Sequence, residues 1–386
     1  MPNIPRIESY ADELTEIRRD FHAHPEIGFE EVRTSGIVAD LLARWGIAVT
    51  RGLGKTGVVG VLEGRGPGRT IGLRADMDAL PMDEQTNLPW TSKNAGVFHG
   101  CGHDSHTTML LGAARYLAET RDFEGTVTFI FQPAEEGLGG ARAMIADGLF
   151  EQFPCDEIYG IHNSPYHDPG IVGVKTGAAM AGAEFFDIDI TGKGSHGAAP
   201  HMGRDPVVIG AGLVQELQTI VSRNVSATSA AVVSVTQIHG GNAYNVIPET
   251  VRLSGTVRYF DRAVKDQIVQ RMQALCDGFA VAFESEIRLD VRNVFDVLVN
   301  DADRAASVAE VARGVVGADK VITGGDPVMG SEDMADMLAV VPGAYFTVGH
   351  KGDVPVHNPG FILDDEILPV GASMFARLVE ARGAAA

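Results

Sequence analysis

The middle of the chain carries six secondary-structure signals in a fixed order, and this order constrains the fold more than any other feature. Alternating apolar residues predict strands, and apolar residues spaced three to four apart predict helices. The six segments are a strand at 183–194, a helix at 205–223, strands at 229–240 and 249–260, a helix at 261–283 and a strand at 284–294. The order βαββαβ predicts a ferredoxin-like unit.

The segments before this unit predict a different architecture. Amphipathic patterns predict helices over 9–24, which Pro25 stops, and over 30–46. The alternating run TVTFIFQ, residues 126–132, predicts a strand that ends before Pro133. Because helix and strand patterns interleave, we expect an α/β domain whose mixed sheet has helices on both faces.

The ferredoxin-like unit is expected to interrupt this α/β domain. A helix predicted around Ala302–Val316 marks where the first domain resumes. We therefore predict an α/β domain made of residues 1–179 and 296–386, with the unit inserted at 180–295. A chain of 386 residues is long enough to bury the cores of two domains.

Composition excludes several classes of partner. Lys and Arg number 31 against 51 Asp and Glu, which gives a net charge of −20. This acidic balance argues against nucleic acid or an anionic membrane as a partner. No apolar run approaches the length of a membrane span, the N-terminal residues show no signal-peptide core, and three cysteines make no disulfide framework. We therefore expect a cytoplasmic protein.

The stretch HGCGHDSH, residues 99–106, places three histidines and a cysteine within eight residues. A closed structural zinc site needs four ligands, typically paired cysteines, and the chain has no second cysteine pair. The glycines that flank Cys101 allow backbone conformations that other residues resist. Asp104 or Ser105 can cap the helix predicted to follow. Cys101 and His103 on such a stiff turn are suited to binding a metal.

Further candidate ligands follow other apolar runs. Glu135 and Glu136 come after the strand predicted at 126–132, where α/β sheets place their sites. Successive side chains there point apart, so one carboxylate can bind metal while its neighbour faces a metal-bound water. His162 follows another short apolar run, and His357 lies between two prolines that would hold it rigidly.

Ten stretches, in this order, carry a resemblance to a known family. They are RRDFHAHPEIGFEEVRT, RADMDALPM, HGCGHDSHTTMLLGAA, FQPAEEG, GIHNSPYHDPG, GKGSHGAAPH, NVIPET, GTVRYFD, GSEDM and VHNPGF. Together they resemble the two-metal amidohydrolases and carboxypeptidases that include aminoacylases, in particular the branch of hippurate hydrolases and auxin-conjugate hydrolases. The resemblance covers nearly the whole chain. It implies that the ferredoxin-like unit is the family's lid, which commonly forms a homodimer or homotetramer.

The resemblance implies five metal ligands. A cysteine would bridge two ions, two histidines would complete one site, and a glutamate with a histidine would complete the other. In that order they are Cys101, then His103 and His162, then Glu136 and His357. Other branches use a carboxylate bridge and a histidine from a His-x-Asp pair, whereas this chain has Asp76-Met-Asp78. Cys101 and His103 would replace both functions, which leaves Asp76 and Asp78 to orient a ligand imidazole.

The resemblance also implies the groups that act on the substrate. Glu135 would be the general base, and His196 would stabilise the developing oxyanion, commonly across the dimer interface. Asn245 and Arg258 would hold the substrate's free carboxylate. Simpler roles stay open, because Arg258 could pair with an acidic residue of the lid and Asn245 could form a turn. The remaining histidines are expected to be structural or exposed; His106, one helical turn from His103, is the nearest to an exception.

Elementary chemistry favours the same reaction. An amide is a poor electrophile, and two metals can deprotonate one water and polarise the scissile carbonyl. Cysteine with histidine favours zinc, with manganese, cobalt and nickel as alternatives. Glu135 can take the proton of the water and return it to the leaving amine. A cationic His196 would stabilise charge that appears only in the transition state, and Arg258 can bind a carboxylate through two hydrogen bonds.

The predicted function is hydrolysis of R–CO–NH–CHR′–COO⁻, an N-acyl-amino acid of the hippurate or N-acetyl kind, to a carboxylic acid and an amino acid. The alternatives on the same site are a dipeptidase or carboxypeptidase and a deacetylase of an acetylated metabolite. A non-catalytic binding protein is the third alternative. The intact Glu135 argues against it, since a chain that had lost catalysis would be expected to lose its base or a ligand.

Overall fold

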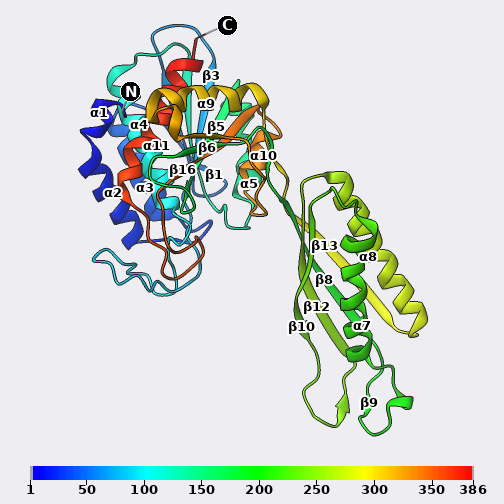
Figure 1. The fold of residues 1–386 in the computed structure, drawn as a ribbon. Helices are drawn as coiled ribbons and strands as arrows, with labels where there is room; N and C mark the ends of the chain where they lie inside the picture. The colour runs from blue at the N-terminus through cyan, green and yellow to red at the C-terminus, as the bar shows by residue number, and fades with distance from the viewer. Residues whose placement is uncertain (1–2, 385–386) are drawn as a thin grey trace. The chain divides into compact units, whose positions relative to one another are not determined.

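The computed structural model describes residues 3–384 and divides them into two compact units (Figure 1). The first unit comprises the chain up to Ala179, Leu298–Asp326, and the chain from Asp333 onward. The second comprises Met180–Val297 and Pro327–Glu332. We predict domain boundaries at 179/180 and 295/296. Whether the two parts fold independently at these boundaries stays a prediction.

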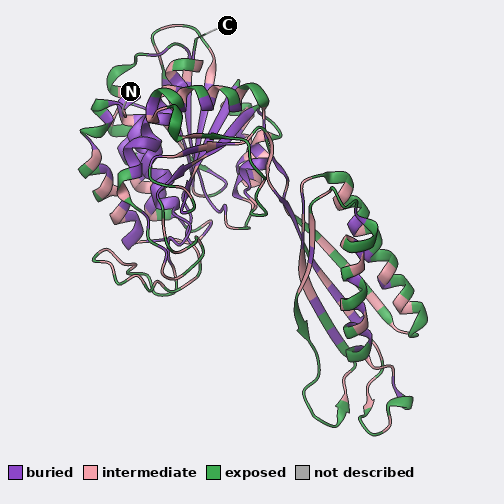
Figure 2. Ribbon diagram, in the orientation of Figure 1, coloured by how far each residue is buried: buried purple, intermediate pink, exposed green. Residues whose placement is uncertain are grey.

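The first unit is built on a mixed sheet of eight strands. In spatial order the strands are β1 (Ala48–Leu53), β2 (Gly57–Glu63), β4 (Thr126–Gln132), β3 (Thr70–Asp76), β5 (Glu157–Ser164), β16 (Gly343–Gly349), β6 (Val172–Val174) and β15 (Val321–Thr323). The four central strands β4, β3, β5 and β16 run parallel to one another. Their residues are almost all buried, as expected of parallel strands that are covered on both faces (Figure 2).

Helices cover both faces of this sheet, which confirms the predicted α/β class. One face is covered by α1 (Pro5–Glu8), α2 (Ala11–Ala23), α3 (Val32–Arg44), α4 (His103–Thr120), α9 (Ala302–Val316) and α11 (Leu368–Arg382), and the other by α5 (Gly140–Ala146), α6 (Leu149–Gln152) and α10 (Met334–Leu338). Successive residues of β5 point to opposite faces of the sheet. Ile161 packs toward Gly371 of α11, whereas a Cβ on Gly160 would meet Met334 of α10. Nearly every residue of α4 is buried, so it is the central helix of the core.

The second unit is the predicted ferredoxin-like unit. Its elements are β8 (Gly182–Thr191), α7 (Pro206–Thr219), β10 (Ala231–His239), β12 (Thr250–Tyr259), α8 (Arg262–Ala282) and β13 (Glu286–Phe295). The sheet order is β10-β12-β8-β13 and every pairing is antiparallel. Both helices pack on one face of the sheet (Figure 1). A short ribbon of β9 (Ser195–His196) and β11 (Val246–Ile247) completes the unit.

The element bounds follow the sequence signals closely. The strand TVTFIFQ is β4 with the predicted limits, and the helix over Ala302–Val316 is α9. The helix predicted over 205–223 ends earlier, at Thr219, and a π-helical turn follows in which the Val225 N–H donates to the Ile220 carbonyl. Among residues 3–384, no helix has the length and apolar character that crossing a bilayer requires.

Two short strands lie where the chain passes between the units. β7 (Gly177–Met180) and β14 (Leu298–Asn300) form a separate two-stranded sheet. The Asn300 side chain donates to the Lys175 and Tyr345 carbonyls and accepts from the Tyr345 N–H. These hydrogen bonds tie the returning chain to β16 of the large sheet.

Candidate metal centre

The carboxyl ends of three neighbouring parallel strands bring the predicted polar residues together. Asp76 ends β3, and Asp78 follows two residues later. Glu135 and Glu136 follow β4, while His162 lies near the end of β5. Because the carboxyl ends of parallel strands meet at one edge of a sheet, residues that are far apart in the sequence lie side by side here.

The turn that carries Cys101 and His103 depends on a glycine. Gly102 has φ +93°, and a Cβ at this position would come within 2.4 Å of the Asn163 Oδ1. Helix α4 begins directly after it, at His103, without a side-chain cap. The predicted capping by Asp104 or Ser105 is therefore wrong, because the cap position is Gly102 and both residues lie inside the first turn, where the Asp104 Oδ1 accepts only from the adjacent Ser105 N–H at 3.0 Å.

Asp104 is used elsewhere, which explains the missing cap. Its buried carboxylate accepts from His22 Nδ1 at 2.8 Å and from Arg18 Nη1 at 3.2 Å. Burial alone would raise the pKa of Asp104, but the hydrogen bond from His22 and the nearby cations lower it overall. The Ser105 hydroxyl donates to the Gly102 carbonyl at 2.6 Å instead. Tertiary ion pairing thus outweighs local capping at this helix start.

Two groups of potential metal ligands share one cysteine. Within each group the ligand atoms lie within 4.8 Å of one another. The first group is Cys101, His103 and His162, and the second is Cys101, Glu136 and His357. The Cys101 Sγ is 3.4 Å from His162 Nε2, and the Glu136 Oε1 is 3.2 Å from His357 Nε2. All five residues that the family resemblance proposed as ligands are therefore brought together.

Hydrogen bonds leave the ligand nitrogens of two histidines available. His103 Nδ1 donates to Asp78 Oδ1 at 3.1 Å, which leaves its Nε2 as the nitrogen that could bind a metal, and this buried Nε2 has no hydrogen-bond partner in the described chain. His162 Nδ1 donates to the Asn163 carbonyl at 2.6 Å, and its Nε2 faces Cys101. A buried nitrogen without a partner is costly unless something binds it. The residues therefore fit a divalent transition metal.

The electrostatics also favour positive charge at this point. Hydrogen bonds with Cys101 and Glu136 raise the pKa of His357 to about 10, so the site stabilises a cation there. Burial raises the pKa of the Cys101 thiol, with the Glu136 carboxylate as the next cause. A thiolate at Cys101 therefore needs a cation beside it, which a metal ion would supply.

The backbone of two ligand loops is held by hydrogen bonds across the site. The Glu136 N–H donates to Asp78 Oδ2 at 3.0 Å. His357 has φ +62°, a left-handed conformation that is uncommon outside glycine, and its N–H donates to the Gly100 carbonyl at 2.8 Å. This hydrogen bond to the Cys101 loop is a restraint on His357 in addition to the one predicted from the flanking prolines.

His106 is a site residue that the sequence reasoning left without a role. Its Nδ1 donates to Asp76 Oδ1 at 2.6 Å, and its Nε2 accepts from the Asn163 N–H at 2.9 Å. Asp76 is 4.0 Å from His103 Nδ1, so it holds His106 more closely than that predicted ligand. The spacing of one helical turn from His103 was the signal that pointed to His106, because it places both imidazoles on one face of α4.

The predicted substrate groups lie in the second unit. His196 is exposed, and its Nδ1 accepts from the Ala198 N–H at 3.0 Å, which leaves the Nε2 as the ring donor. Asn245 is also exposed, and its carbonyl accepts from the Gly197 N–H at 2.8 Å. The two residues are therefore neighbours on the β9–β11 ribbon.

Arg258 on β12 has a different environment from these two residues. It is half-buried, it donates to the Ser331 hydroxyl, and burial lowers its pKa. No carboxylate lies within ion-pair distance of it among residues 3–384, so pairing with an acidic residue of the lid does not explain it. A guanidinium with free donors is suited to binding an anionic group.

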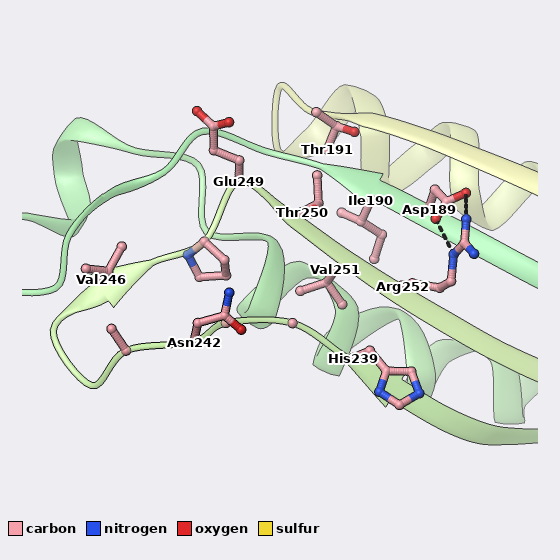
Figure 3. Close-up of a pocket in the computed structure, with 14 residues that line it drawn as sticks. Asp189, Ile190, Thr191, His239, Asn242, Val246, Glu249, Thr250, Val251 and Arg252 are labelled. Atoms are coloured by element: carbon pink, nitrogen blue, oxygen red, sulfur yellow. Dashed lines mark hydrogen bonds and ion pairs between the residues drawn. The ribbon is translucent and has the colours of Figure 1, made fainter.

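The second unit also has a surface cavity of about 830 Å³ (Figure 3). It lies between the 239–249 loop and the ends of β8 and β12. Figure 3 shows the Arg252 side chain paired with Asp189 at one end, with hydrogen bonds of 2.6 and 2.9 Å. The lining residues include none of the predicted metal, catalytic or substrate groups. This cavity is therefore separate from the candidate metal centre.

Comparison with known proteins agrees with this geometry. The model of peptidase family M20/M25/M40 matches residues 72–381. The chain is 40% identical to the hippurate hydrolase of Campylobacter jejuni, over 97% of this chain and 98% of that one. It is 39% identical to the N-acetyl-L-cysteine deacetylase of Bacillus subtilis, over 97% and 88%. The crystal structure of Bacillus subtilis YXEP, a dinuclear metal-binding peptidase of the M20 family, superposes with a TM-score of 0.84 at 34% identity, covering 97% of this chain and 98% of that one.

These matches confirm the resemblance seen in the sequence motifs. They span nearly the whole chain, both units included, and they extend over the stretches that carry the clustered cysteine, histidines and glutamates. This chain therefore belongs to peptidase family M20/M25/M40.

Proposed function

We propose that this protein is a metal-dependent amidohydrolase that cleaves N-acyl-amino acids into a carboxylic acid and a free amino acid. The observation that carries the proposal is the pair of ligand groups sharing Cys101, with the carboxylate of Glu135 beside them. The relatives named hippurate hydrolase and N-acetyl-L-cysteine deacetylase act, by those names, on amides of this class. Their high coverage of both chains supports the transfer.

The residues of the centre would hold two divalent transition-metal ions, with zinc preferred by the cysteine and histidine donors and manganese, cobalt or nickel as alternatives. Cys101 would bridge the ions, His103 and His162 would complete one site, and Glu136 and His357 the other. When bound, the ions would polarise the scissile carbonyl and make water a nucleophile at neutral pH. The hydrogen bonds from His103 to Asp78 and from His162 to the chain would orient the two imidazoles.

Glu135 would move the proton of the reaction. The residue is only 6% exposed, and its Oε2 lies 4.0 Å from His103 Nε2. It would accept a proton from the attacking water as the new C–O bond forms. It would then deliver this proton to the amide nitrogen as the C–N bond breaks, which releases the amine in neutral form. A nearly buried carboxylate suits this role because little water competes for the proton.

The second unit would supply the groups that bind the substrate. The Nε2–H of His196 would donate to the oxyanion as it develops on the carbonyl oxygen. Arg258, with Asn245, would bind the free carboxylate and so select amides of amino acids over simple amides. We further propose that this unit forms the contact of a homodimer or homotetramer. All three cysteines are free, which supports a reducing, cytoplasmic location.

A substrate panel tests the proposal. Purified enzyme loaded separately with zinc, manganese, cobalt or nickel would be assayed on N-benzoyl, N-acetyl and N-indolylacetyl amino acids and on dipeptides. We expect release of the amino acid from at least one N-acyl series, and loss of that activity after treatment with a chelator. Cleavage of dipeptides alone would replace the proposal with the dipeptidase alternative. A metal-loaded enzyme that cleaves none of these compounds would contradict it.

A further inference from the structure

Glu31 is a buried carboxylate that the proposed chemistry does not use. It is 0% exposed, and burial raises its pKa to about 7. No lysine or arginine forms an ion pair with it in the described part of the chain. Its two oxygens instead accept from the Ala134 N–H at 2.8 Å and from the Thr56 hydroxyl at 2.5 Å. A carboxylate buried without a cation is costly, so its retention calls for a reason.

The Ala134 contact lies at a strained point of the backbone. Ala134 has φ +56°, a left-handed conformation that a residue with a Cβ adopts only when its surroundings impose it. Its N–H is bound by Glu31, and its carbonyl accepts from the Gly140 N–H at 3.0 Å. The chain before Glu31 also packs on this turn, because a Cβ on Gly28 would come within 2.9 Å of the Ala134 Cα.

This strained turn carries the general base and a metal ligand. Glu135 and Glu136 follow Ala134 directly, and the Glu136 N–H donates to Asp78 Oδ2. Buried carboxylates therefore accept from the N–H groups of residues 134 and 136, on both sides of Glu135. The other oxygen of Asp78 accepts from His103. The direction of the Glu135 side chain thus depends on backbone hydrogen bonds to two acids that lie far from it in the sequence.

We infer that Glu31 is a positioning residue, which holds the Ala134 turn so that Glu135 and Glu136 face the metal centre. The inference rests on the proposed function, because it concerns the same reaction. Glu31 belongs to the stretch RRDFHAHPEIGFEEVRT, for which the sequence suggested no chemical role. Acting through the backbone, it would influence the orientation of the base without touching the substrate. A misplacement of the base by about 1 Å can lower a rate roughly 10²-fold.

Three variants separate this role from a purely structural one. Glu31→Ala removes the acceptor, and we expect kcat for an N-acyl-amino acid to fall roughly 10²-fold, with KM little changed. Glu31→Gln retains an oxygen that can accept from the Ala134 N–H, so it should recover most of kcat. Thr56→Val removes the other partner of Glu31 and leaves the Ala134 contact in place, so kcat should stay close to that of the wild type. Thermal unfolding would be measured for all three.

Metal retention provides a readout that does not depend on turnover. Because Glu136 lies on the same turn, Glu31→Ala should lose metal to a competing chelator faster than Thr56→Val does. Should Glu31→Ala fail to fold, Glu31→Asp takes its place, since the shorter side chain cannot reach the Ala134 N–H as well. It is then expected to show the same two losses to a smaller extent.

The outcomes distinguish the inference from the proposed function. A wild-type enzyme that cleaves no N-acyl-amino acid would defeat the proposed function itself. An active wild type together with unchanged kcat and metal retention in Glu31→Ala would overturn the inference alone. Equal losses in Glu31→Gln and Glu31→Ala would also overturn it, because the acceptor geometry would then not matter. Losses in Thr56→Val as large as those in Glu31→Ala would reduce the effect to general packing.

Discussion

The sheet edge of the first unit and the β9–β11 ribbon of the second differ in how they hold their candidate functional groups. At the sheet edge, His103 and Asp78 are buried and held by hydrogen bonds to other side chains or to the backbone. On the ribbon, His196 and Asn245 are exposed, and their hydrogen bonds join residues of the ribbon region itself. The candidate metal ligands are thus built into the core, whereas the predicted substrate-binding groups lie where rearrangement disturbs little packing.

The physical reason for this difference lies in what each region must do. Ligands of an ion need fixed distances and a low-dielectric surrounding, which only a packed core supplies. A donor that meets a substrate must allow the substrate to enter and the product to leave. The four predictions below test this contrast, in order of decreasing expected effect.

The largest effect is expected at Cys101, the residue common to both ligand groups. Cys101→Ala should abolish activity and remove both ions, because each site would lose a ligand. Elemental analysis of the wild type should approach two ions per chain, with almost none in the variant. Cys155→Ala is the matched control, since Cys155 is free and outside the ligand groups. Full metal content in Cys101→Ala would contradict this prediction, because metal binding in the core would then not require Cys101.

The adjacent glutamates should separate into two roles. Glu135→Gln should retain metal and lower kcat by roughly 10²–10⁴-fold, the usual worth of positioned proton transfer. Glu136→Gln should lose metal as well as activity, because it removes a ligand. Parallel measurement of kcat and metal content in the two variants checks this. Near-normal kcat in Glu135→Gln would exclude Glu135 as the general base. Equal metal loss in both variants would show that the two glutamates do not have separate roles.

An intermediate effect is expected on the ribbon. His196→Ala should lower kcat by about 10²-fold, as loss of an oxyanion donor does, with metal content unchanged. His201→Ala is the control, because His201 is an exposed histidine of the same unit. Metal loss in His196→Ala would contradict the separation between the two regions.

Subunit exchange sharpens the same prediction. Mixing the weakly active variants His196→Ala and Glu135→Gln should restore up to half of the sites if His196 acts across a dimer. Each mixed dimer would then contain one site with both an intact base and an intact imidazole. Confirmed exchange without recovery would assign His196 to its own chain or to no catalytic role.

The smallest effect is expected at Asp78, which accepts a hydrogen bond from His103 and would orient this imidazole without binding the ion. Asp78→Asn should weaken metal affinity by roughly 10–100-fold, the usual effect of losing a residue that orients a ligand. Excess metal in the assay should then restore much of the activity. Competition with a chelating dye measures the affinity. An unchanged affinity would show that the core fixes His103 without this hydrogen bond, which would weaken the contrast between the sheet edge and the ribbon.

Much of the fold could be predicted because its signals are local. The alternation in TVTFIFQ sets the limits of β4, and the apolar spacing of 302–316 sets those of α9. The βαββαβ order was enough to identify the ferredoxin-like unit. The five ligand candidates were found because Cys, His and Glu stood in motifs that a family resemblance could match. Each of these predictions depended on residues that are close together in the sequence.

The connections among the site residues were decided by the tertiary structure. Nothing local indicates that Asp76 binds His106, or that Asp104 turns toward His22 instead of capping its own helix. Glu31 and Ala134 are in contact although they are 103 residues apart. The left-handed backbone of Ala134 could not be predicted either, because alanine, unlike glycine, rarely adopts that conformation. Side-chain type and spacing determine which residues can bind a metal. Only the packing of distant segments determines which nitrogen keeps its lone pair and which carboxylate holds which turn, because those choices depend on neighbours that the sequence does not place side by side.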